Sequence, residues 1–211
     1  MLTVLAHVRV RSMADPLKIK PSPQIARTIK LLTDGTMSKW SNGRIPKLTR
    51  EQAIGFTANL IQETGSADLS NLDVVEQGRA EGRGIGQFTG ARRQAYEQWA
   101  SRYPNRNNPD AQLQYVAKEY RGDFDPNGNS LIGYTKSFEQ APKGVTPQDA
   151  ALYFSRTYFR PGEPHNERRV NYAKQLDQAY PVAAPKPIPK PQAAVKKQSP
   201  LKIFGITLPF Q

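Results

Sequence analysis

Helix-start signals recur along the middle of this chain and constrain its fold more than any other feature. Thr49–Gln52 (TREQ) has the pattern of a capping box, in which a hydroxyl and an amide three residues apart satisfy free backbone N–H groups. Asn108 precedes Pro109, and Thr146 precedes Pro147, so a capping side chain stands directly before a proline suited to the first helical turn. These signals predict a mostly helical domain.

The segment 50–64 should be a largely buried helix. Its apolar residues cover more than one face, and Gly65 is a natural stop. Further helices are expected at about 90–103, from Pro109 onward, from Pro147 onward and from Asn166 to just before Pro181.

Glycines interrupt this helical pattern in residues 74–88 (VVEQGRAEGRGIGQF). Gly78, Gly82, Gly84 and Gly86 fall within fifteen residues, which predicts a small β-hairpin or loop excursion. The expected fold class is therefore α+β, mostly α, with one small β-like insertion.

Basic residues gather at the two ends of the chain. The net charge is +12; residues 1–30 hold six basic residues and one acidic residue, and residues 181–211 hold five lysines and no acid. We expect four zones: a basic extended leader (1–30), a folded domain (31–180), a proline-rich linker (181–200) and an apolar docking peptide (201–211). A nucleic-acid-binding fold should carry its basic stripe on the folded part, so nucleic acid is not an expected partner.

The sequence gives little support for a disulfide scaffold, a metal site or a membrane span. The chain has no cysteine, and His7 and His165 lie far apart, so neither a disulfide scaffold nor a zinc site is expected, and no metal or cofactor is predicted. No segment approaches the roughly 18–20 apolar residues of a membrane span, and the first residues make a poor signal peptide. If the chain is an enzyme, carboxylates are therefore its natural catalytic groups.

Glu63 is the first such candidate. It falls in the last turn of the expected 50–64 helix, where the negative end of the helix dipole disfavours its ionised form. Burial beside Leu60 and Ile61 should act in the same direction and raise its pKa, as a general acid requires. A solvated surface charge remains the alternative on position alone.

Four blocks of sequence bear on this choice. The stretches 48–65 (LTREQAIGFTANLIQETG), 82–100 (GRGIGQFTGARRQAYEQWA), 110–120 (DAQLQYVAKEY) and 158–176 (YFRPGEPHNERRVNYAKQL) together resemble the lysozyme-like superfamily, most closely the phage tail lysozyme domains. The resemblance implies cleavage of the β-1,4 bond between N-acetylmuramic acid and N-acetylglucosamine in peptidoglycan. It maps Glu63 onto the catalytic glutamate that protonates the leaving oxygen.

The same resemblance assigns Gly86, Gln87 and Phe88 to the segment lining the sugar cleft. Gln87 can hydrogen-bond an N-acetyl or hydroxyl group, and Phe88 can form an apolar wall. The alternative for both residues is a tight turn packed on the core. Arg92 and Arg93 should open a helix on its exposed side, where they are solvated or attract the acidic polymer.

The second catalytic group is left open. A two-carboxylate mechanism requires a partner about 5–9.5 Å from the acid, and the candidates are Asp68, Asp73, Glu76 and Glu81. A lytic transglycosylase needs no such partner, because the 6-hydroxyl of the substrate is the nucleophile.

The resulting expectation is a virion-associated muramidase, carried in the tail or inside the particle, that acts on the host wall in the periplasm. The leader and the C-terminal tether would dock on other tail or virion proteins. An endolysin, or a structural or ejected tail protein with a degenerate lysozyme-like domain, are the alternatives.

Overall fold

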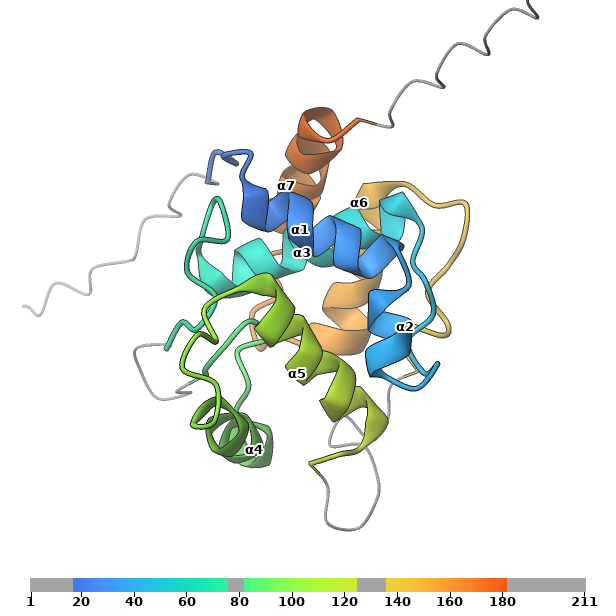
Figure 1. Cartoon of the computed structure of the whole chain (residues 1–211). Helices are drawn as coiled ribbons and strands as arrows, with labels where there is room; N and C mark the ends of the chain where they lie inside the picture. The colour runs from blue at the N-terminus through green and yellow to red at the C-terminus, as the bar shows by residue number, and fades with distance from the viewer. Residues whose placement is uncertain (1–16, 76–81, 125–135, 182–211) are drawn as a thin grey trace, which may run out of the picture. The chain divides into compact units, whose positions relative to one another are not determined.

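The computed structural model describes residues 17–75, 82–124 and 136–181, coloured in Figure 1. Its contacts divide the chain into Met1–Pro181 and Val182–Gln211. The second unit lies outside the described residues, so the linker 181–200 (beyond Pro181) and the docking peptide 201–211 remain predictions. The helices and the cleft all belong to the first unit.

Helices dominate the described residues, which confirms the mostly helical α+β class. They are α1 (Pro23–Thr33), α2 (Thr36–Trp40), α3 (Arg50–Thr64), α4 (Gly90–Ala100), α5 (Pro109–Arg121), α6 (Pro147–Phe154) and α7 (Asn166–Ala179). A π-helical turn, η1 (Ser155–Phe159), continues α6. The glycine-rich segment forms isolated antiparallel bridges, Val75 with Arg83 and Arg83 with Phe88.

Helix α3 is the centre of the domain. It begins and ends where the sequence predicts, with the Thr49–Gln52 capping box formed and Gly65 in a left-handed conformation (φ 62°). It packs against α1, α6 and α7 (Figure 1). Gly55 permits the close approach of α6, because a Cβ there would lie 2.5 Å from the backbone nitrogen of Ala151. The C-terminal end of α3, which carries Glu63, is therefore held on several sides.

The other predicted starts also form. Asn108 caps α5 by accepting from the backbone N–H of Ala111, and Thr146 forms a capping box with Asp149 at α6. Helix α4 ends at Ala100, three residues before the expected end. It joins α5 through its aromatic residues, with Tyr96 and Tyr115 edge to face at 5.0 Å.

The expected extended leader through residue 30 is wrong in its last part. Residues 23–33 form α1, because Ser22 caps it and Pro23 occupies its first turn, a pairing that starts a helix rather than breaking one. The residues before it lie against α7: the backbone N–H of Ile19 donates to Gln175 (2.8 Å) and that of Ser22 to Tyr180 (2.8 Å). Residues 1–16 lie outside the described residues.

Within the described segments, no helix combines the length and apolar character needed to cross a membrane.

Candidate active site

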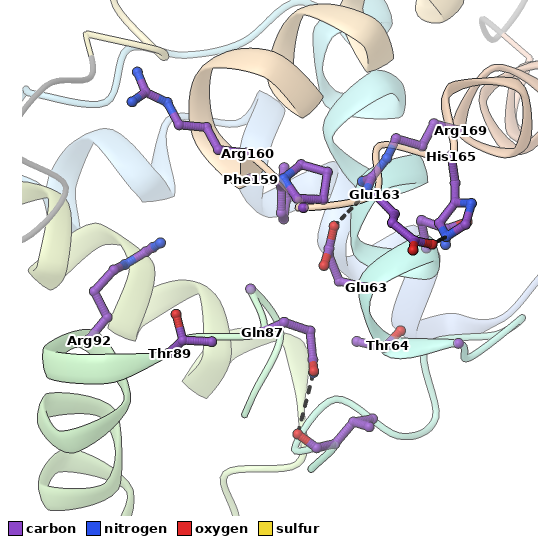
Figure 2. A pocket seen from close by; sticks show the side chains of 16 residues that line it. Glu63, Thr64, Gln87, Thr89, Arg92, Phe159, Arg160, Glu163, His165 and Arg169 are labelled. Atoms are coloured by element: carbon purple, nitrogen blue, oxygen red, sulfur yellow. Dashed lines mark hydrogen bonds and ion pairs between the residues drawn. The ribbon is translucent and has the colours of Figure 1, made fainter. Parts of the chain in front are cut away.

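A cleft of about 830 Å³ lies at the C-terminal end of α3 (Figure 2). Its walls come from the end of α3, the turn at residues 86–89, the start of α4, and the segment that joins η1 to α7. The lining residues are Gln62, Glu63, Thr64, Gly65, Val74, Gly86, Gln87, Thr89, Arg92, Phe159, Arg160, Pro161, Gly162, Glu163, His165 and Arg169.

Glu63 is a cleft residue rather than a surface charge. Its side chain is 12% exposed, and its neighbours Leu60 and Ile61 are fully buried. Because Gly65 stops α3 two residues later, the carboxyl group stands at the end of the helix, beside the cleft.

A buried arginine holds this carboxylate. The Nη2 of Arg169 in α7 donates to Oε1 of Glu63 at 2.7 Å (Figure 2), and the Arg169 side chain is 1% exposed. The same guanidinium donates from Nη1 to Oδ1 of Asn59 (2.5 Å) and from Nε to the carbonyl of Pro164 (2.7 Å). A cation at this distance favours the carboxylate form, so it opposes the helix-dipole and burial effects that the sequence indicated.

In the Gly86–Gln87–Phe88 turn, two residues line the cleft and the third lies in the core. Gly86 and Gln87 line the cleft, with Gln87 in a left-handed conformation (φ 45°) and its amide donating to the Gly84 carbonyl at 3.0 Å. Phe88 is fully buried, with its ring 4.9 Å from that of Tyr115. The structure thus places Phe88 in the core, as in the alternative interpretation, and not on the cleft wall.

Arg92 is not the solvated residue that the sequence suggested. Its guanidinium makes a two-pronged ion pair with Glu119, whose side chain is fully buried (Nε–Oε1 2.6 Å, Nη2–Oε2 2.9 Å), and lies 4.8 Å from the Phe88 ring centroid. Burial alone would lower the pKa of Arg92, but the Glu119 carboxylate raises it above its ordinary value. Arg93 pairs instead with Glu97 one turn along α4 (2.9 Å).

Asp73 lies outside the cleft lining. Its carboxylate accepts from Arg106 (2.6 Å), Tyr96 (2.7 Å) and Arg83 (3.3 Å). Burial acts to raise the pKa of Asp73, but these donors outweigh it and hold the pKa below its usual value. Through these three contacts, Asp73 stabilises the loop that follows α3.

Asp68 also lies outside the cleft lining. Asp68 accepts from the backbone N–H of Ser70 (2.9 Å) and the hydroxyl of Ser66 (3.1 Å), so it shapes the turn after α3. Glu76 and Glu81 lie outside the described residues.

Sequence reasoning missed a further cleft acid. Among the described lining residues, Glu163 is the acid besides Glu63; it is 86% exposed and lies 3.5 Å from Nε2 of His165. Its segment has left-handed backbone at both Arg160 (φ 46°) and His165 (φ 43°). Such conformations are unusual for these residue types and fix the path of the segment along the cleft.

Arg169 and Asn59 were also missed, although the sequence carries a signal for each. Asn59 stands four residues before Glu63 and therefore on the same face of α3. Arg169 shares the buried face of α7 with Tyr172, Ala173 and Leu176. A charged residue on the buried face of a helix indicates a paired partner.

A family model described as phage tail lysozyme matches residues 37–180, which include every described residue that lines the cleft. No curated protein and no solved structure matches the chain.

Proposed function

This chain belongs to the phage tail lysozyme family, and on that premise we propose that it is a virion-associated, muramidase-type glycosidase with Glu63 as its general acid. Its substrate is the β-1,4 bond between N-acetylmuramic acid and N-acetylglucosamine in peptidoglycan. The observation that carries the proposal is a carboxyl group, 12% exposed, that lines a cleft of about 830 Å³ and is held by a buried arginine.

The chemistry starts with Glu63. In the acid form its proton passes to the glycosidic oxygen as the C–O bond breaks, which leaves positive charge on the sugar ring. Restricted contact with water beside Leu60 and Ile61 supports the acid form, and the Arg169 guanidinium stabilises the carboxylate left after proton transfer. Gln87, whose amide is anchored in its own turn, is proposed to contact the N-acetyl or hydroxyl groups of the glycan.

The identity of the nucleophile separates two versions of this proposal. In the hydrolase, a second carboxylate activates water or attacks the sugar, and Glu163 joins Glu76 and Glu81 as a candidate for that role. In a lytic transglycosylase, the substrate's own 6-hydroxyl attacks and Glu63 serves first as acid and then as base. The buried position of Glu63 fits both versions, and the products distinguish them.

The test is release of soluble fragments from purified sacculi. Glu63→Gln keeps an oxygen that accepts from Arg169 but has no acidic proton to transfer to the leaving oxygen, so turnover should fall by about two orders of magnitude or more. Glu167→Gln in α7 is the matched control, because it makes the same chemical change at an exposed acid. If the wild-type protein releases nothing across pH and salt, or if Glu63→Gln retains full activity, the proposal is wrong.

Mass spectrometry of the fragments resolves the reaction type. Hydrolysis gives reducing ends, whereas the transglycosylase gives 1,6-anhydro ends. We propose that the activity opens the host wall locally during infection, with the protein carried by the particle through contacts of its two terminal segments.

A further inference from the structure

Arg169 makes hydrogen bonds to three separate positions around the cleft. It reaches Glu63 and Asn59 on α3, and the Pro164 carbonyl in the segment that precedes its own helix. An arginine that is 1% exposed requires such partners, because an uncompensated buried charge is strongly unfavourable. An apolar residue on this face of α7, which also carries Tyr172, Ala173 and Leu176, would have packed without that requirement.

Asn59 prepares the position of Arg169. Its Nδ2 donates to the carbonyls of Gly55 and Ala151, both at 2.9 Å, which turns its Oδ1 toward Nη1 of Arg169. A chain of contacts thus runs from α6 through Asn59 and Arg169 to Glu63. Because the donors of the planar guanidinium have a fixed geometry, the contact with Asn59 also orients the donor that Arg169 directs at Glu63.

We propose that Arg169 is a positioning residue for the acid Glu63, an inference that rests on the proposed function. Because Nη2 of Arg169 donates to Oε1, the proton of the acid form belongs on Oε2, and the rotation of the carboxyl group is fixed before substrate binds. Through Pro164, the same side chain sets the distance between Glu63 and the cleft segment that carries Glu163 and His165.

Arg169 also sets the charge that Glu63 experiences. The other charged or titratable cleft groups are Arg92 from α4, which is paired with Glu119, and Arg160, Glu163 and His165 from the segment after η1. Removal of the cation at 2.7 Å favours the neutral acid, so the alkaline limb of the rate profile should move to higher pH. A residue with a purely structural role would not move this limb.

The experiment compares Arg169→Met and Arg169→Lys with wild type, using kcat, KM and the pH profile on purified glycan strands. For Arg169→Met we expect kcat to fall about 100-fold, KM to change less than about threefold, and the alkaline limb to move to higher pH. Arg169→Lys keeps the positive charge but loses the planar, two-pronged geometry of the guanidinium. The alkaline limb of its pH–rate profile should therefore stay at the wild-type pH, while kcat recovers only in part.

Arg50→Met is the matched control. Arg50 fastens the opposite end of the same helix pair, donating to the Asp177 carboxylate (2.7 Å) and to the Tyr180 carbonyl (2.9 Å from Nε). It should lower the melting temperature as the Arg169 variants do, and leave kcat and the pH limb unchanged.

Each result of this comparison either supports the positioning role of Arg169 or overturns it. Arg169 variants with wild-type kcat and pH limb, or a shift shared by Arg50→Met, overturn the inference. If Arg169→Met does not fold, the folded Arg169→Lys variant decides: a wild-type kcat overturns the inference, and so does a fall in kcat that Arg50→Met shares, whereas a fall in kcat that Arg50→Met does not share supports it. An inactive wild-type protein overturns the proposed function itself.

Discussion

Arg92, which lines the cleft, donates to both carboxylate oxygens of Glu119, an acid with no exposed surface. The pair joins α4 to α5 and sits over the ring of Phe88. One wall of the cleft therefore includes an arginine whose charge is compensated by a fully buried carboxylate.

Breaking this pair should destabilise the domain. Glu119→Leu removes the carboxylate that compensates the largely covered Arg92 charge, and we expect the free energy of unfolding to fall by roughly 3–5 kcal/mol. Adding Arg92→Met removes that charge and should recover much of the loss. Urea denaturation of the wild type, of Glu119→Leu, of Arg92→Met and of the double variant checks this. A double variant whose loss equals the sum of the two single losses would contradict the prediction.

Gly86 should not tolerate a methyl group. A Cβ there would lie 2.6 Å from the Phe88 ring, so Gly86→Ala forces the turn or the ring to move, with a loss of about 1–3 kcal/mol and lower activity. Gly162→Ala, also on the cleft but with nothing within 4 Å, is the control and should stay within about 0.5 kcal/mol. Melting curves measured side by side suffice, and equal effects would refute the prediction.

Asp73 should make stability depend on acid pH. Its pKa is lowered in the folded state, so its contribution is present above the unfolded pKa of about 3.9 and is lost as pH falls through the folded value. Asp73→Asn should therefore cost about 2 kcal/mol at pH 6 and progressively less as pH falls below about 4. Unfolding free energies measured across this range test it; a difference that grows toward low pH has the wrong sign.

Asn59 and Arg169 should act as one unit. Asn59→Ala removes an acceptor from Arg169, so both kcat and stability should fall, the latter by roughly 1–3 kcal/mol. The double variant Asn59→Ala/Arg169→Met should lose less kcat than the two single losses combined, because the contacts are shared. Independent effects in this double-mutant cycle would show that Asn59 does not act through Arg169.

The C-terminal residues should serve docking and not catalysis. Deletion of residues 181–211 removes the proline-rich linker and the apolar end while leaving every residue that lines the cleft. We expect muropeptide release to be preserved and incorporation into particles to be lost, as measured by immunoblotting of purified virions. Normal incorporation of the shortened protein would exclude a docking role.

Local interactions explain what the sequence by itself determined. The bounds of α3 follow from a capping box at one end and a left-handed glycine at the other, both within a few residues of the helix. The starts of α5 and α6 follow from Asn108 and Thr146 in the same way. The candidate acid was identified because Glu63 lies at the end of such a helix and within a block that resembles a known family.

Only the tertiary structure decided which side chains meet. Arg169 is 106 positions from Glu63, and its contact with the carboxylate depends on α7 packing against α3. Phe88 faces the core and Arg92 is held in an ion pair because α5 supplies Tyr115 and Glu119, which no local pattern near residue 90 indicates. Helix caps act over three or four residues, whereas burial and ion pairing depend on which faces of distant helices come together, and this is why the acid could be predicted and its surroundings could not.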